Sequence, residues 1–404
     1  MMFIRLSNDS GEGTEREDVG VKKRLIQFSS NALESQRGFT MVELLITMVV
    51  FVFVMAAASQ IFSGLLTQFK QQSKIAETNI EGMVGLDILR RDIEHAGYGL
   101  PWSFQNPINY SEATETPASS YNDAPADPPR GIVSGDGVVR GSDYLVLKAV
   151  NVVGSETAGK WTALLSTPEP FIETYNPRQW SPSGDNLAND DRVIVMAMGG
   201  STNQRMLVVR DGAFWDTYSN LASWAPSTAS DIRIVYGVDS ASDLVSPFNR
   251  SDYFISTANV PSRCAPNTGV LVKAILNHDN VGSFTSLPLL DCVADFQVTF
   301  WLDTNNDNAI DWPPLDDISG LTAQEIRERL REVRIYVVAH EGQRDETYDF
   351  SMNDTRTFLS ATEILGSTSR SLEFADLKEL VGDSDYKRYR WKLSTVAVRP
   401  LNLR

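Results

Sequence analysis

Residues Phe39 to Leu66 read FTMVELLITMVVFVFVMAAASQIFSGLL, and Glu43 is the only charged residue among them. A helix that crosses the hydrocarbon core of a membrane needs about 20 apolar residues. The apolar stretch is long enough, and it passes into a polar helical pattern rather than into a signal-peptide cleavage site. We therefore predict a membrane-spanning helix over residues 39–66, in preference to a secretory signal peptide or the buried helix of a soluble protein.

The residues that precede this helix predict its orientation. Lys22, Lys23, Arg24 and Arg37 lie on its N-terminal side, and basic flanking residues stay in the cytoplasm. The N-terminus is therefore expected inside the cell and the rest of the chain on the exported side. Residues 7–18 are polar and acidic, so Val21 is an alternative to Met1 as the true translation start.

The composition limits the classes of function. The 404 residues carry a formal net charge of -16, which disfavours direct binding of nucleic acid. Apolar residues make up 42% of the chain, enough to bury a core. Its three histidines, His95, His278 and His340, are far apart in sequence and form no HExxH motif. We predict a protein that is not an enzyme and requires no cofactor.

Glu43 is unusual because a carboxylate inside a membrane helix costs several kcal/mol unless it is paired, protonated or near the interface. One explanation is a position close to the cytoplasmic headgroups. The surrounding string, RGFTMVELLI at residues 37–46, offers another, because it resembles the type III signal sequence of type IV prepilins. The resemblance implies that a prepilin peptidase cuts between Gly38 and Phe39 and that Phe39 becomes N-methylated. It also implies that Glu43 pairs with the terminal amine of a neighbouring subunit during assembly.

The helical pattern continues beyond the membrane segment, over residues 67–97. Gly97, Gly99 and Pro101 are expected to end it. An apolar stripe recurs along this part at helical spacing, and a sheet of the exported head is expected to cover it. The stripe consists of Ile80, Met83, Val84, Leu89 and Ile93.

The exported head, residues 98–404, is predicted to be β-rich and antiparallel, which gives an α+β, pilin-like fold class. Residues 102–142 are expected to form a long irregular loop. A charged helix is predicted at Thr322–Arg331, and the remaining elements are strands. The predicted strands are Tyr144–Val150, Arg192–Met198, Arg205–Arg210, Ile232–Tyr236, Tyr253–Ser256, Val270–Leu276, Leu289–Leu302, Val333–His340 and Tyr386–Val398.

Two features of the head suggest local chemistry. Cys264 and Cys292 can form a disulfide in an exported domain, with two buried free thiols as the alternative. The loop after residue 302 places oxygen-bearing residues at alternating positions, as in calcium loops; its candidate ligands are Asp303, Asn305, Asp307, Ala309 and Asp311. Asn308 replaces the expected glycine and Pro314 the expected glutamate, so a polar turn remains the alternative to a structural calcium site.

Beyond the signal, the pattern of the longer chain resembles that of the PilW-type minor pilins. A long chain with a prepilin signal, the string RRDIEHAGYG at residues 90–99 and a basic, aromatic C-terminal strand carry this resemblance. It implies a structural role in a type IV pilus, either in priming its assembly or at its tip, with other pilins and the prepilin peptidase as partners. The expected location is the bacterial inner membrane before assembly and the pilus, cell surface or periplasm afterwards. A minor pseudopilin of type II secretion and a tip adhesin or ligand-binding module are the alternatives.

Overall fold

A computed structural model of the chain describes residues 38–165, 179–199, 205–226, 231–350, 357–359, 372–381 and 385–403. The predicted leader, apart from Gly38, lies outside the described residues. Two compact units are distinguished, with their boundary after Gly64. Each unit is described by itself below.

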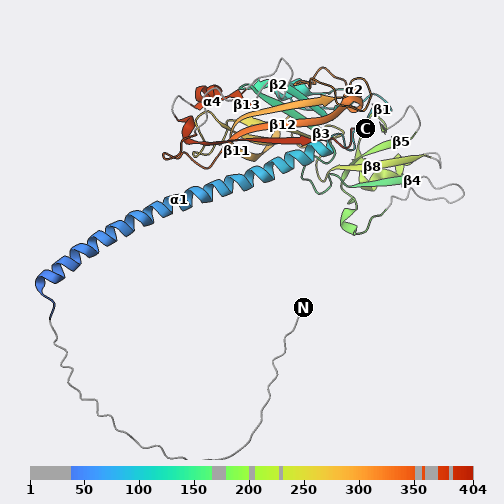
Figure 1. The fold of residues 1–404 in the computed structure, drawn as a ribbon. Coiled ribbons are helices and arrows are strands. Elements are labelled where there is room, and N and C mark those ends of the chain that lie inside the picture. Colours follow the sequence, from blue (N-terminus) through green and yellow to red (C-terminus); the bar gives the residue numbers. More distant parts are fainter. Residues whose placement is uncertain are drawn as a thin grey trace, which may run out of the picture. The chain divides into compact units, whose positions relative to one another are not determined.

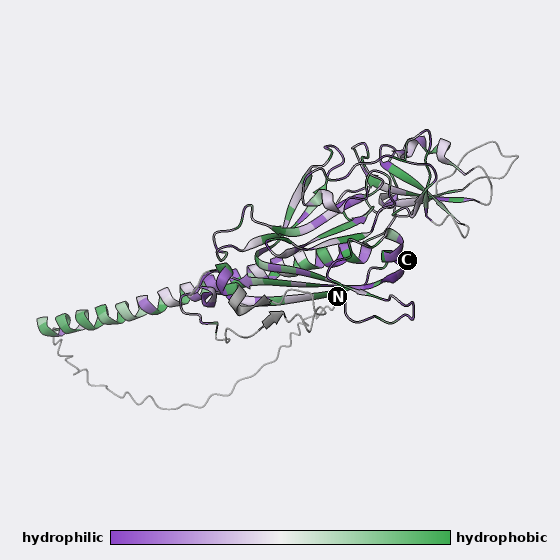
Figure 2. Ribbon diagram, turned by 90° about the horizontal axis from the view of Figure 1, so that it is seen from above, coloured by the Kyte–Doolittle hydropathy of each residue, from purple (hydrophilic) through white to green (hydrophobic). Residues whose placement is uncertain are grey.

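Helix α1 runs without interruption from Met41 to His95. Its N-terminal part is almost uniformly hydrophobic (Figure 2), and every residue from Met41 to Lys70 is exposed. Among the described residues, α1 is long and apolar enough to cross a membrane. Gly97 and Gly99, both with positive φ, follow its C-terminal end, as the glycine pattern predicts.

The head contains a seven-stranded antiparallel sheet, with strand order β15-β12-β11-β10-β9-β3-β2. Its strands are β2 (Ile132–Val139), β3 (Ser142–Ala149), β9 (Asn249–Ser256), β10 (Gly269–Leu276), β11 (Phe284–Leu302), β12 (Leu330–Glu341) and β15 (Arg390–Val398). The C-terminal part of α1 lies along this sheet (Figure 1).

A second sheet follows the order β1-β6-β5-β8-β4, and β7 pairs with β5. Its strands are β1 (Ser103–Phe104), β4 (Trp161–Leu165), β5 (Arg192–Met198), β6 (Met206–Leu207), β7 (Asp216–Thr217) and β8 (Ile232–Asp239). The smaller elements are β13 (Thr357–Leu359), β14 (Leu372–Glu373), α2 (Ala323–Arg329), α4 (Phe374–Val381) and the 3-10 turns η1 (Ala118–Tyr121), η2 (Ser183–Asp185), η3 (Tyr218–Trp224) and η4 (Tyr386–Arg388).

The main core lies between α1 and the seven-stranded sheet. Leu89 and Ile93 of the helix are fully buried there with Leu145, Phe296 and Val337 of the strands. The alternation of apolar side chains along these strands directs one face of the sheet toward the helix. The predicted α+β class, with a long N-terminal helix packed on a β-rich antiparallel head, is confirmed.

Some predicted elements differ from the structure. The expected loop over residues 102–142 contains strand β2. Gly135 lies in this strand, and its missing side chain leaves room for the hydroxyl of Tyr121. The strand expected over residues 205–210 is reduced to Met206–Leu207. Residues 386–398 begin with η4 before β15.

The expected apolar stripe of the helix was only partly right. Leu89 and Ile93 are buried, but Ile80, Met83 and Val84 are 59%, 68% and 56% exposed. The helix turns a different face to the sheet because small residues on that face allow closer approach than large ones. The buried face consists of Thr78, Gly82, Gly85, Leu89, Asp92 and Ile93.

Candidate processing and assembly site

The start of α1 is built by a reciprocal pair of hydrogen bonds. The Glu43 backbone N–H donates to Thr40 Oγ1 at 3.2 Å, and the Thr40 backbone N–H donates to Glu43 Oε2 at 3.0 Å. This arrangement is a capping box, which satisfies backbone donors that the first helical turn leaves free. Glu43 therefore has a local partner within its own chain.

Gly38 and Phe39 precede this cap and are open to approach. Nothing lies within 4 Å of the position that a Cβ would take at Gly38, and Phe39 is 84% exposed. The peptide bond that the prepilin resemblance singles out is thus accessible beside a structured helix start. A peptidase that must approach the backbone closely meets no steric obstacle at this glycine.

In the head, two glycines set the distance between α1 and β11. A Cβ at Gly85 would lie 2.1 Å from the Leu289 carbonyl oxygen, and one at Gly82 would lie 3.2 Å from Leu290 Cδ1. The backbone of α1 therefore lies against the backbone of the sheet at Gly85. Of the three helix glycines, only Gly64 has open space around it.

A buried polar cluster fixes the same helix face. Asp92 of α1 accepts a hydrogen bond from the Tyr253 hydroxyl of β9 and pairs with the Lys273 ammonium of β10. All three side chains are buried. Burial raises the pKa of the Asp92 carboxyl, although the Lys273 charge opposes this. Because a half-satisfied buried charge is costly, this cluster specifies one register of the helix on the sheet.

The disulfide lies beside a second helix contact. Cys264 and Cys292 are bonded to each other, as predicted for an exported domain. Arg263, the neighbour of Cys264, contacts Glu81 of α1 at 3.0 Å and Asp291 at 2.6 Å. The disulfide thus joins the segment of Arg263 to the segment of Asp291, and the Arg263 guanidinium contacts both Asp291 and Glu81.

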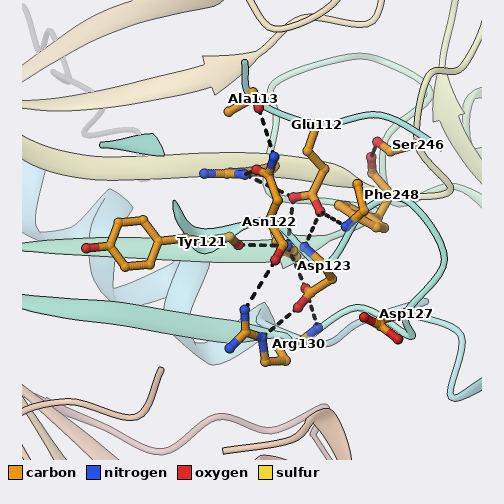
Figure 3. A network of polar contacts seen from close by, with 12 residues as sticks. Glu112, Ala113, Tyr121, Asn122, Asp123, Asp127, Arg130, Ser246 and Phe248 are labelled. Carbon is orange, nitrogen blue, oxygen red and sulfur yellow. Dashed lines mark hydrogen bonds and ion pairs between the residues drawn. The ribbon is translucent and has the colours of Figure 1, made fainter. Parts of the chain in front are cut away.

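A further network of buried ions fastens the loop before β2 to the sheet (Figure 3). Lys148 Nζ lies 2.6 Å from carboxylate oxygens of both Glu112 and Asp123. Arg250 contacts Glu112 at 3.0 Å and Asp252 at 2.7 Å. Burial would raise the pKa of Glu112, but the Lys148 and Arg250 charges outweigh it and hold that pKa below its usual value. The network is a structural clamp that favours the ionised forms of Glu112 and Asp123.

Replacing Lys148 by methionine should destabilise the head by about 3–5 kcal/mol, because Glu112 and Asp123 would keep buried charge without their shared partner. Urea denaturation of the full chain measures this loss. The control is Lys392→Met, since Lys392 is 57% exposed in its pair with Glu341 and should cost less than about 1 kcal/mol. Equal losses for both variants would contradict the clamp. Adding Glu112→Gln to Lys148→Met should recover part of the loss.

The loop proposed for calcium forms hydrogen bonds of its own. Asp303 is buried, pairs with Arg331 at 2.5 Å and accepts the backbone N–H groups of Asp307 and Asn308, each at 3.2 Å. Asp311 accepts the backbone N–H of Thr304 at 2.7 Å. Asn305 Oδ1 and Asp307 Oδ1 likewise accept amides within the loop, the latter from Ala309. These contacts are those of a polar turn, and calcium stays a prediction.

Burial shifts the pKa values of three groups in the head, two of them downward and one upward. Burial lowers the pKa of His278 and of His340 to about 4. Burial also raises the pKa of Asp143 to about 8, although the carboxylate accepts the backbone N–H groups of Val298 and Gly137. Above pH 4 the folded histidines are therefore neutral, while the folded Asp143 keeps its proton at neutral pH.

These shifts predict that the stability of the head is greatest near pH 6.5. From pH 4 to 6.5 the unfolded histidines bind protons that the folded ones do not, so stability rises with pH there. From pH 6.5 to 8 the folded Asp143 holds a proton that the unfolded chain lacks, which lowers stability by about 2 kcal/mol. The unfolded histidines, about half protonated at pH 6.5, offset roughly half of this loss, so the net fall should be about 1 kcal/mol. Thermal unfolding across this range measures the effect. Asp143→Asn should remove the decline above pH 6.5, and a decline that persists in this variant would contradict its origin in Asp143.

The structure assigns roles to several residues that sequence reasoning missed. The T-x-x-E spacing of Thr40 and Glu43 is the signature of a capping box, and the same spacing caps α2 through Thr322 and Glu325. Lys148 was recognisable only as a charge inside an apolar strand. No sequence signal paired it with Glu112, which lies in a distant loop.

One comparison with known protein families identifies a motif in the N-terminal segment. Residues 34–59 match the family model for the prokaryotic N-terminal methylation motif, a range that contains Gly38, Phe39 and Glu43. No curated protein matches the chain. Among solved structures, the chain is similar to a type IV-like pilin from Thermus thermophilus with 8% identity, over 81% of this chain and 98% of that one, at a TM-score of 0.28. The chain therefore carries a prepilin-type methylation motif on an apolar helix suited to membrane anchoring.

Proposed function

We propose that this chain is a minor pilin, a structural subunit that takes part in assembly or initiation of a type IV pilus at its tip. The observation that carries the proposal is the methylation motif at residues 34–59, located at the start of an exposed apolar helix. In this proposal, a prepilin peptidase cleaves after Gly38, and Phe39 becomes the N-methylated first residue of the mature chain.

The exposure of α1 supports assembly with other subunits. Its N-terminal part buries no side chain within the described chain, and such apolar surface requires a membrane or apolar partners. Helices of other pilins provide such partners after extraction from the bilayer. Ile80, Met83 and Val84 extend the exposed apolar surface onto the part of the helix that belongs to the head unit.

Glu43 has a specific role in this proposal. In the uncleaved chain its carboxylate caps the helix through Thr40. Cleavage creates an ammonium group at Phe39, and in a low-dielectric filament core an ammonium of a neighbouring subunit neutralises the carboxylate. The capping box positions the carboxylate at the helix start, where this partner arrives. The proposed role is structural, with no catalytic step.

The test is the N-terminal residue of the protein from the native membrane and from the sheared surface fraction, determined by mass spectrometry. A chain that begins at N-methylated Phe39 supports the proposal, and its recovery in the sheared fraction favours a pilus over a type II secretion pseudopilus. A chain that retains residues before Phe39 in both fractions contradicts it. Processed chain confined to the membrane fraction favours the pseudopilus.

A further inference from the structure

A pocket of about 620 Å³ lies beside the C-terminal end of α1 in the head. Arg91 of the last helical turns, Asn151 after β3, Trp161 of β4 and Trp180 contribute to its wall. This volume is in the range that holds small ligands. The pocket shares no residue with the motif at Gly38 and Phe39 or with the calcium loop.

Two tryptophans form its aromatic wall. Their ring centroids are 4.7 Å apart with the planes at 58°, and Trp161 is 38% exposed. Trp180 Nε1 donates to the Trp161 carbonyl oxygen at 2.6 Å, which fixes the Trp180 indole relative to β4. Rings held in this way offer a large apolar surface at low entropic cost. Such a surface suits the C–H face of a pyranose ring.

Asn151, a residue of the same pocket wall, carries an unsatisfied acceptor. Its Oδ1 is buried and has no hydrogen-bond partner among the residues that the structure describes. A buried acceptor without a donor is unfavourable, and rotation of the Asn151 amide toward the pocket would let it accept from a ligand hydroxyl. The neighbouring turn needs Gly159, whose φ is +88° and whose Cβ would lie 3.2 Å from Asn151 Cβ.

The charged groups at the pocket have mixed sign. Arg91 and Lys160 supply donors, and Asp185 supplies acceptors. Asp92 also lines the pocket, so a purely anionic ligand would meet two carboxylates and a purely cationic ligand would meet Arg91 and Lys160. Sugar hydroxyls both donate and accept, so they match donors and acceptors together. We propose that this pocket, with Trp161, Trp180 and Asn151 as its binding residues, binds a saccharide.

The test is a titration of the full chain, purified in lauryldimethylamine oxide because an alkyl maltoside would offer its own sugar to the pocket. The probes are maltotriose, triacetylchitotriose and sialyllactose, followed by tryptophan fluorescence. We expect saturable binding of at least one, with a Kd below about 1 mM. No saturable change with any of the three up to about 10 mM would overturn the proposal.

Single substitutions test whether the saccharide binds at this pocket. Trp161→Ala and Asn151→Ala should each weaken binding at least about tenfold. The matched control is Trp312→Ala, which removes a 59% exposed tryptophan from another ring pair of the head and should leave the Kd unchanged. Thermal unfolding verifies that each variant folds, and Asn151→Ala keeps the test valid if the tryptophan variant does not. Binding that both folded variants leave unchanged would also overturn the proposal. Neither result bears on processing at Gly38, so this inference fails independently of the proposed pilin function.

Discussion

Replacing Gly38 by leucine is expected to leave the leader attached and to lower the processed fraction by at least about a hundredfold. The reason is local, because a peptidase that reads this motif must bring its catalytic groups against the backbone between Gly38 and Phe39. A branched side chain at Gly38 displaces that backbone from the reacting groups. Since nothing lies within 4 Å of the Cβ position, the substitution has no effect through the fold of the described chain.

Intact-mass spectrometry of the membrane fraction measures the processed and unprocessed chains directly. Gly64→Leu is the matched control, because Gly64 also has open space around its Cβ position and lies in the helix that follows the cut, far from it. The control should be processed normally, with leucine favouring the helix by up to about 1 kcal/mol. Normal processing of Gly38→Leu would show that the glycine is not recognised. Failure of both variants would assign the defect to the helix.

Replacing Gly85 by alanine is expected to destabilise the head by about 3 kcal/mol. The new Cβ would lie 2.1 Å from the Leu289 carbonyl oxygen and 2.7 Å from its carbonyl carbon. Relief requires movement of the helix or of β11, because the obstacle is backbone rather than a flexible side chain. That movement would disturb the buried pair of Asp92 and Lys273. The gain in helix propensity, about 1 kcal/mol, is too small to compensate.

Alanine substitutions at the other two helix glycines should cost less stability than the substitution at Gly85. At Gly82 an added Cβ meets only the end of the Leu290 side chain, at 3.2 Å, and at Gly64 it meets nothing within 4 Å. Urea denaturation of the full chain should therefore rank the cost as Gly85→Ala, then Gly82→Ala, with Gly64→Ala neutral or stabilising. A cost for Gly85→Ala no greater than that for Gly82→Ala would contradict the close backbone approach.

The sequence predicted the features that depend on local pattern. The apolar helix follows from a continuous run, and the strands over residues 192–198 and 270–276 follow from β-rich runs bounded by turn residues. The motif around Gly38 was recognisable because each of its elements has a fixed offset. The disulfide followed from the compartment and the presence of only two cysteines.

Features set by tertiary contact were not predictable in this way. Hydrophobicity indicated the side of α1 with Ile80 and Met83, but the sheet packs on the side with Gly82 and Gly85, since close backbone contact outweighs side-chain size there. The ion network joins Glu112 to Lys148 and Arg250 across long sequence separations. The tryptophan pocket joins the end of α1 to β4, which the sequence analysis did not identify as a strand.

The contact between Arg263 and Glu81 has a mechanical consequence. In the proposed filament, a pull on the fibre would act on the head through α1, which runs into it. Glu81 is an early point where that tension meets the sheet, through a guanidinium that also contacts Asp291. Cys264 and Cys292 are the immediate neighbours of Arg263 and Asp291, and their covalent bond prevents the two segments from being peeled apart. Cys264 precedes β10 and Cys292 lies in β11, so the bond passes tension directly to β11 instead of extending the residues between the two cysteines.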